Sequence, residues 1–134
     1  MAKKVVNTSG KRKTAVARAV ARKGEGRLRV NRTPIEIFQP ELARIKILEP
    51  VAIADKKFGK MDVDVNVKGG GIMGQADAVR TALARVIVEF TGDEELKEQF
   101  LYFDRTLLVN DTRLKLPKKQ LGRGARKKRQ KSYR

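Results

Sequence analysis

The sequence predicts a single small domain of strands and helices, followed by a basic C-terminal extension. Its 134 residues suffice for one hydrophobic core but not for two ordinary domains. A strand pattern, a glycine-rich turn and a helix pattern follow one another between Met61 and Phe90. Beyond Arg113, apolar residues are few and scattered among basic ones. We therefore expect a folded domain over residues 1–112 and a tail over residues 113–134.

The block between Met61 and Phe90 is the best candidate for the centre of the core. From Met61 to Lys68, apolar and polar residues alternate, which is typical of a strand with one buried face. From Ala76 to Phe90, apolar residues recur every three or four positions, which is typical of an amphipathic helix. Packing this helix on the strand would contribute about 1.5–3 kcal/mol per large buried side chain, before the entropy of ordering is subtracted.

The glycines of Gly69–Gly74 lie between this strand and helix and match the G-x-G-x-x-G spacing of dinucleotide-binding folds. Such folds need a second parallel strand ending in an acidic residue, and the glutamates that follow the helix have no strand pattern before them. A phosphate-binding loop also fails, because Gln75 stands in place of its lysine. Two other interpretations stay open: the glycines permit a tight turn, or the helix start holds a phosphate of a polymer.

The N-terminal region combines a polar start with a predicted hairpin. Met1–Lys13 is cationic and is expected to have little structure before binding, with residues 1–10 flexible. In Thr14–Arg22 the alanine content favours a helix, whereas the alternation favours a strand. An Arg-rich helix here would be typical of an organellar transit peptide. The turn residues Lys23–Gly26 and the alternation in Arg27–Asn31 favour strands instead, so we expect a β-hairpin.

The arginines of this predicted hairpin are expected on exposed strand faces: Arg18, Arg22, Arg27 and Arg29. They could pair with Asp62 and Asp64 of the central strand on a solvated surface, or they could face RNA. The spacing of these two aspartates would also suit a metal or acid–base site. The sequence has no histidine and no third placed acid to complete one, so we predict no metal site.

Four shorter elements are predicted around the central block. They are an extended piece at Ile35–Phe38, a helix between Pro40 and Pro50, a helix at Glu94–Leu101 and a strand at Thr106–Val109. Leu42, Ile45 and Leu48 would form the apolar stripe of the first helix, and Asp93 would cap the second.

The net charge of +17 is concentrated at the two ends of the chain. Residues 1–32 carry +10, residues 33–111 carry −4 and residues 112–134 carry +11. This pattern indicates a polyanionic partner, and it favours nucleic acid over a membrane surface. The chain has no cysteine and no histidine, which excludes thiol and imidazole chemistry and the common zinc sites. Apolar runs do not exceed four residues, so we expect a soluble, cytoplasmic protein without a membrane span.

The tail over residues 113–134 cannot build a core and repels itself, so it is expected to be disordered until it binds. Gly122 and Gly124 keep its backbone adaptable, and the run Arg126–Arg129 can contact phosphates. Tyr133 can stack on a base or a ribose. RNA binding is therefore the favoured function. A nucleotide-dependent enzyme that uses the glycine turn and a DNA-compacting protein are the alternatives.

Three blocks of the sequence resemble the family of the universal ninth protein of the small ribosomal subunit. They are Gly10–Ala15, Asn66–Ala78 with its glycines and Gln75, and the basic C-terminus. Asp104–Val109 and the ending Gln130–Arg134 are similar to the archaeal and eukaryotic branch, whereas bacterial tails usually end in Ser-Lys-Arg. The chain is identified as an archaeal-type member of this family.

The resemblance implies an α+β fold of two layers, similar to the second domain of the fifth small-subunit protein. A mixed four-stranded sheet would be covered on one face by helices and would contain a left-handed βαβ crossover. The family is not enzymatic, so neither a cofactor nor a small-molecule substrate is expected. The implied location is the head of the small subunit in the cytoplasmic ribosome. The implied partners are small-subunit rRNA, neighbouring ribosomal proteins of the head, and peptidyl-site tRNA, with no membrane.

The residues expected to contact rRNA come from the N-terminal region, the glycine turn and the tail. They are Lys11, Arg12, Lys13, Arg18, Arg22, Arg27, Arg29, Gly70, Gly71, Gln75, Arg123, Arg126, Lys127, Lys128 and Arg129. By resemblance, the tip of the tail approaches the anticodon stem-loop of peptidyl-site tRNA. That tip comprises Lys131, Ser132, Tyr133 and Arg134, with Tyr133 interrupting the usual ending.

Overall fold

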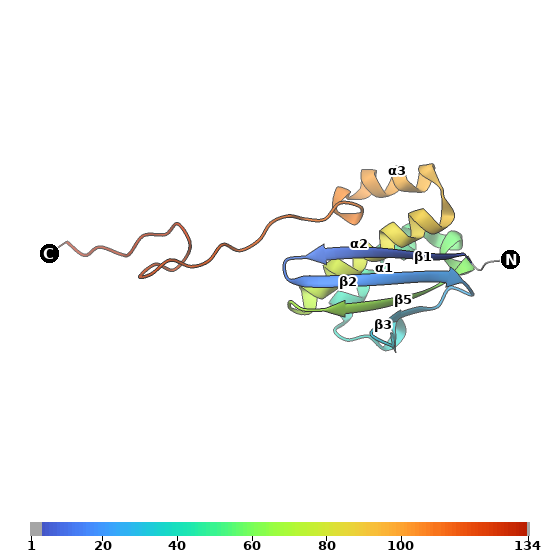
Figure 1. The fold of residues 1–134 in the computed structure, drawn as a ribbon, viewed down its shortest axis with the longest axis horizontal. Helices are drawn as coiled ribbons and strands as arrows, with labels where there is room; N and C mark the ends of the chain where they lie inside the picture. Colours follow the sequence, from blue (N-terminus) through green and yellow to red (C-terminus); the bar gives the residue numbers. More distant parts are fainter. Residues whose placement is uncertain (1–3, 134) are drawn as a thin grey trace.

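The computed structural model describes residues 4–133 as a sheet with helices packed on one face and an extended tail (Figure 1). The strands are β1 (Val5–Arg12), β2 (Ala15–Lys23), β3 (Leu28–Val30), β4 (Thr33–Pro34) and β5 (Met61–Lys68). The helices are α1 (Glu41–Ala54), α2 (Ile72–Thr91) and α3 (Glu94–Phe103), and 3₁₀ segments lie at Ile35–Ile37, Asp55–Lys60 and Arg105–Leu107. The two-layer α+β fold is confirmed, with a short fifth strand added. None of the helices within residues 4–133 has the length and apolarity needed to cross a membrane.

The strand order β1-β2-β5-β3-β4 shows that the predicted hairpin between β2 and β3 is wrong. β2 pairs antiparallel with β1 and with β5, whereas β3 pairs in parallel with β5. The alternation in Arg27–Asn31 indicated a strand correctly, but it carried no information about which strand would be its neighbour. The central strand β5, which is later in the sequence, inserts between β2 and β3.

The expectation that Met1–Lys13 has little structure is also wrong, because Val5–Arg12 forms the edge strand β1. β1 pairs with β2 along its whole length and Val6 packs against the core, so its order comes from tertiary contacts that its own sequence pattern did not reveal. Gly10 packs directly on α2, where an added Cβ would lie 2.2 Å from the carbonyl oxygen of Ala78. Residues 1–3, also expected to be flexible, lie outside the described residues.

β2 and α2 meet through small side chains, which explains why an alanine-rich segment forms a strand here. The inward-facing residues of β2 are all alanine and are buried: Ala15, Ala17, Ala19 and Ala21. α2 contributes buried Ala78 and Ala82, which lie against Gly10 of β1, together with the larger buried Val79 and Leu83. Small residues on both surfaces let the helix approach the sheet closely, and this tertiary contact overrides the helix propensity of alanine.

β5 alternates as predicted, with Met61, Val63, Val65 and Val67 at most 5% exposed. Asn31, which has a left-handed φ of 49°, extends the β3–β5 ladder through its side chain. Its Nδ2 donates to the Val67 carbonyl at 3.2 Å, and its Oδ1 accepts from the Val67 N–H at 2.9 Å. β3 and β5 are thus parallel neighbours connected through α1. The left-handedness that the resemblance implies for this crossover stays a prediction.

The helix α1 differs from the prediction at its end and on its buried face. Pro50 lies inside α1 and is buried, so it does not end the helix. Ala43 and Ile47 face the core, whereas Leu42 and Ile45 are 66% and 55% exposed. Apolar residues occur on several sides of α1, so periodicity could not select the buried one. The preceding Ile35–Ile37 is a 3₁₀ turn, so the extended piece predicted there is wrong.

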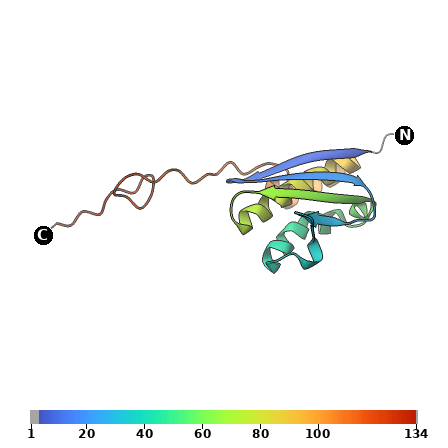
Figure 2. The same cartoon turned by 60° about the horizontal axis from the view of Figure 1, so that its bottom comes forward.

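The region after α2 contains one confirmed prediction and one correction. Asp93 caps α3 as predicted, its Oδ1 accepting from the N–H groups of Glu95 at 3.0 Å and Leu96 at 3.4 Å. The predicted strand Thr106–Val109 is wrong, since a 3₁₀ turn forms at Arg105–Leu107. The side chain of Asp104 accepts from the Thr106 N–H at 2.8 Å and favours this turn. The tail then runs away from the domain (Figures 1 and 2).

Candidate nucleic-acid interface

Three segments come together at the end of the domain from which the tail leaves (Figures 1 and 2). They are the β1–β2 turn at residues 13–14, the loop 69–71 between β5 and α2, and residues 111–113 at the start of the tail. Arg12 and Asp111 form a parallel bridge, and a Cβ on Gly69 would lie 2.5 Å from the Thr14 carbonyl oxygen. We call this region the tail-side end.

The fold requires two of the loop glycines. Gly69 and Gly70 have φ values of +80° and +68°, and a Cβ on Gly70 would lie 3.0 Å from the Cβ of Ala15. Gly71 has an ordinary φ of −95° and open space around it. A tight turn therefore explains Gly69 and Gly70 but not Gly71. The dinucleotide-binding interpretation lacks its second half, because α2 is followed by α3 and not by a strand.

Gln75, at the start of α2, closes the glycine loop. Its side-chain Nε2 donates to the Gly69 carbonyl at 3.1 Å, and its backbone N–H donates to the Gly71 carbonyl at 2.9 Å. The side chain therefore holds the loop in place. Its predicted contact with RNA stays a prediction.

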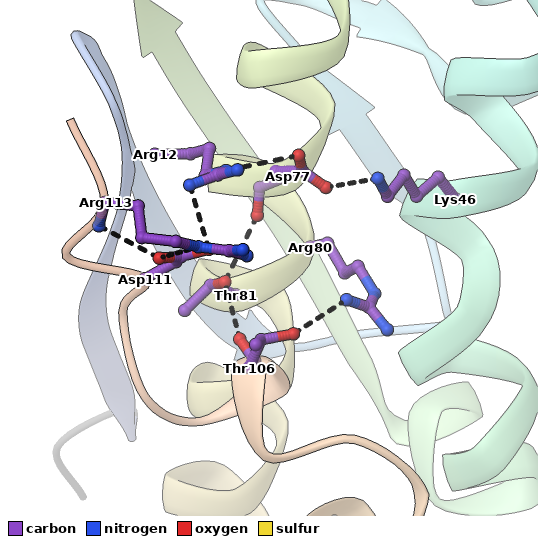
Figure 3. Close-up of polar contacts among 8 residues, drawn as sticks. All are labelled: Arg12, Lys46, Asp77, Arg80, Thr81, Thr106, Asp111 and Arg113. Atoms are coloured by element: carbon purple, nitrogen blue, oxygen red, sulfur yellow. Dashed lines mark hydrogen bonds and ion pairs between the residues drawn. The ribbon is translucent and has the colours of Figure 1, made fainter. Parts of the chain in front are cut away.

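Asp111 fixes the start of the tail to β1 (Figure 3). Its Oδ2 lies 2.9 Å from Arg12 Nη1 and accepts from Arg113 Nη2 at 2.6 Å. Arg12 continues the network to Asp77 of α2 at 3.7 Å, and Asp77 pairs with Lys46 of α1 at 2.6 Å. β1, α1, α2 and the tail are thus joined by alternating positive and negative side chains.

A second cluster, centred on Arg80 of α2, holds the 3₁₀ turn before the tail. Arg80 is 8% exposed and donates to Thr106 Oγ1 at 3.2 Å and to Asp104 Oδ2 at 3.0 Å. Its Nε forms an ion pair with Glu49 Oε2 at 2.6 Å. Thr81 Oγ1 donates to the Thr106 carbonyl at 3.1 Å (Figure 3). Polar contacts with α2 therefore take the place of the predicted strand pairing.

These clusters lower the pKa of two aspartates. Hydrogen bonds from the side chain and the backbone of Arg113 hold the pKa of Asp111 well below its ordinary value of 3.8. Burial raises the pKa of Asp104, but hydrogen bonds from Thr106 and Arg80 outweigh burial, so this pKa is also lowered. Both groups are therefore negatively charged at neutral pH and keep their cationic partners engaged.

The open face of the sheet carries the predicted arginines, all of them exposed. At the end of the sheet far from the tail, Arg27 pairs with Glu25 at 3.0 Å and Arg29 pairs with Asp64 at 3.3 Å. These pairs support the solvated interpretation for Arg27 and Arg29, whereas Arg22 takes part in none of the ion pairs formed within the described residues. Arg18, nearer to the tail, takes part in none of the ion pairs formed within the described residues.

Several cations that form no ion pair within the described residues lie toward the tail-side end. The strand register places Lys11, Val16 and Lys68 in one row across the sheet, and Ser9, Arg18 and Asn66 in the next row. Within residues 4–133, ion pairs include neither Lys11 nor Lys68. Lys68 is not among the residues predicted from the sequence, although its place in the alternation of β5 indicates that it lies on the open face of the sheet. The sequence also did not predict four residues of the ion-pair network, because they lie on separate elements and no local pattern links them: Lys46, Asp77, Asp111 and Arg113.

Asp62 has a structural role. Its Oδ1 accepts from the backbone N–H groups of Arg27 and Glu25, both at 2.9 Å, and so fixes the loop between β2 and β3. The hydrogen bond from the Arg27 backbone, followed by that from Glu25, lowers the pKa of Asp62. Within the part of the chain that the structure describes, no three acidic side chains are grouped as a metal site would need.

The predicted phosphate ligands of the tail are all exposed: Arg123, Arg126, Lys127, Lys128 and Arg129. The tail forms a small loop on itself, in which a Cβ on Gly122 would lie 2.4 Å from the Lys127 carbonyl oxygen. It otherwise extends away from the sheet, so these side chains lie apart from the sheet cations (Figure 1). The expectation for Arg134 concerns a residue outside the described part.

The fold and its charges define a small basic α+β protein with a cationic tail anchored at one end. Residues 10–134 match the family described as ribosomal protein S9/S16, and the chain belongs to this family. It is 61% identical over 131 residues to the small ribosomal subunit protein uS9 of Methanothrix thermoacetophila, covering 98% of this chain and 99% of the relative.

Two further relatives carry the same name. The uS9 protein of Thermoplasma volcanium is 61% identical over 129 residues, which are 96% of this chain and 98% of the relative. That of Methanococcus maripaludis is 54% identical over 133 residues, which are 98% and 99% of the two chains. All three organisms are archaea, so both the family and the archaeal type inferred from the sequence are confirmed. The family is one of ribosomal proteins and not of enzymes.

Proposed function

We propose that this chain is a structural constituent of the small subunit of the cytoplasmic ribosome, where it binds rRNA through its tail-side end and its tail. The charge distribution is the observation that carries this proposal. Residues 112–134 hold eleven basic residues and no acid, and they leave the domain at the end where Lys11, Arg18 and Lys68 form no ion pair within residues 4–133. One folded polyanion can therefore engage both. The names of the archaeal relatives support the assignment to the small subunit.

The binding chemistry is mainly phosphate neutralisation, with specificity from the shape of the folded RNA. Gly71, which the fold does not require, leaves the backbone open at the start of α2. The N–H groups of a first helical turn have no partner within the helix and attract anions. The loop is therefore a second contact point for an RNA phosphate, next to Lys68.

Competition experiments test this function against its alternatives. We expect the full chain to prefer a folded fragment of small-subunit rRNA over duplex DNA of equal length at matched salt. Equal affinity for the two would favour a DNA-compacting protein instead. Calorimetric titration with ATP, GTP and NAD should give no saturable heat, and saturable heat would favour a nucleotide-dependent enzyme.

In this proposal the tip of the tail reaches peptidyl-site tRNA in the head of the subunit. The support is the family resemblance together with the exposure of Lys131, Ser132 and Tyr133 at the far end of the tail. Subunits assembled with a chain that ends at Leu121 should bind peptidyl-site tRNA more weakly than subunits with the full chain. Unchanged tRNA binding in fully assembled subunits would contradict this role.

A further inference from the structure

The last turn of helix α3 carries large apolar side chains that the rest of the described domain leaves exposed. It packs on α1 and α2 through buried Leu96 and Phe100. Its last turn exposes three consecutive large apolar residues: Leu101 is 43%, Tyr102 96% and Phe103 59% exposed. α3 belongs to the helical layer and lies beyond the β1 edge of the sheet (Figure 1). Adjacent exposed apolar side chains of this size are typical of interaction surfaces.

The charge of α3 is opposite to that of the rest of the molecule. Asp93–Asp104 contains five carboxylates and one lysine, a net charge of −4, so the remainder of the chain carries +21. Glu94 pairs with Lys97 at 3.2 Å, while Glu95 and Glu98 are exposed and form no ion pair within the described residues. A polyanion such as RNA is repelled from this helix, whereas a cationic partner is attracted.

We infer that α3 is a docking surface for a basic segment of another protein, rich in arginine or lysine. Glu95 and Glu98 would pair with its cations, and the rings of Tyr102 and Phe103 offer faces on which guanidinium groups stack. In the proposed ribosomal setting, this surface would hold a neighbouring protein while the tail-side end and the tail hold RNA. The two functions are separable, because they use different residues.

The probe is a synthetic peptide of about twelve alternating arginine and glycine residues. The chain has two tyrosines and no tryptophan, so Tyr133→Phe leaves Tyr102 as the sole fluorescent reporter on α3. In this background we expect saturable quenching of Tyr102 at low salt. Glu95→Gln with Glu98→Gln should raise the Kd about fivefold or more, and Leu101→Ser with Phe103→Ser should raise it about threefold.

A matched control removes two exposed acids elsewhere, Glu36→Gln with Glu41→Gln, and should change the Kd by less than about twofold. All these side chains are exposed, so the melting temperatures should stay close together. An equal rise of the Kd in the control variant would mean that the peptide is attracted by acidic residues anywhere on the domain and not by α3 in particular. That result would overturn the inference. Absence of saturable quenching would overturn it as well.

Other occupants give distinct results, and each of them contradicts the inference. Carbodiimide cross-links from α3 to Lys127 or Lys128 within one free chain would identify the chain's own tail. Concentration-dependent sedimentation that the double glutamine variant abolishes would identify a second copy. The affinity of that variant for the rRNA fragment should be unchanged or slightly higher, and a lower affinity would mean that RNA occupies α3. A failure of rRNA binding by the unmodified chain would instead reject the proposed function.

Discussion

The fold requires a glycine at position 69 but not at position 71, although the two residues belong to the same glycine-rich turn. Gly69 combines a positive φ with a backbone neighbour 2.5 Å from its virtual Cβ, whereas Gly71 has neither constraint. The sequence pattern gave both the same weight. The backbone conformation and the approach of the β1–β2 turn, distant in sequence, separate them. This contrast allows the folding and binding roles of the loop to be measured independently.

Gly69→Ala should destabilise the domain by about 2 kcal/mol or more, because left-handed backbone and a close carbonyl oxygen both oppose a Cβ. Gly71→Ala should change the free energy of unfolding by no more than about 0.5 kcal/mol. The second variant should nevertheless bind the rRNA fragment more weakly. Chemical denaturation and RNA titration of both variants check this, and unchanged RNA binding by Gly71→Ala would remove the loop from the interface.

Arg80 is the most deeply buried cation in the clusters that precede the tail. Arg80→Met should cost about 2 kcal/mol of stability, because it leaves the carboxylates of Glu49 and Asp104 without their partner. This value is below that of a fully buried pair, because the two carboxylates are 34% and 36% exposed. The exposed Arg105 provides the control, since Arg105→Met should cost no more than about 0.5 kcal/mol. Equal costs in urea unfolding would show that the Arg80 contacts contribute little.

The lowered pKa values of Asp104 and Asp111 predict a loss of stability in acid. The unfolded chain binds protons at these groups near the ordinary pKa of 3.8, before the folded chain does. Their contribution is therefore complete above about pH 4 and is lost as the pH falls through the lowered folded values. The melting temperature should decrease in this range, and Asp104→Asn should make the decrease shallower. If the melting temperature of the Asp104→Asn variant fell with pH as steeply as that of the unmodified chain, Asp104 would not contribute to the loss of stability in acid.

At the scale of the elements, local periodicity predicted β5 and α2, whose patterns are strong and whose burial follows them. The strand order was not predictable, since backbone pairing between distant segments leaves little trace in a single sequence. β1 is polar and forms because it pairs fully with β2, and the 3₁₀ turn at Arg105–Leu107 forms because Asp104 caps it. In the candidate site, the alternation of apolar and polar residues along the strands predicted that the arginines are exposed. The clusters around Asp77 and Arg80 could not be predicted in this way, because they join four separate elements.

The tail is an element without a core of its own, and its removal should leave the domain folded. A chain ending at Leu121 should keep its free energy of unfolding within about 0.5 kcal/mol, because none of the described residues of the removed segment belongs to the hydrophobic core. Thermal melting monitored by circular dichroism checks this. A chain that fails to fold without the segment would contradict the division into domain and tail.

For the whole molecule, the sequence predicted a cationic segment of little structure at each end, whereas the described residues form a C-terminal tail and a cationic sheet region. The N-terminal basic residues from Val5 onward lie largely on strands, so their charge is fixed to the domain surface. Residues 112–134 carry +11 and the other residues carry +6 together. The charge asymmetry alone was sufficient to predict a polyanionic partner. The positions of the acidic residues on the surface of α3, and of the lysines near the tail that form no ion pair within residues 4–133, could be found only from the tertiary fold.

The salt dependence of rRNA binding tests the central claim most directly. If six to ten basic residues meet phosphates, a plot of log K against log salt should have a slope of roughly −4 to −9 for the full chain. Removing residues 122–134 deletes seven basic residues and should make this slope about half as steep. A slope near zero for the full chain, or an unchanged slope after truncation, would show that the tail does not neutralise RNA phosphates.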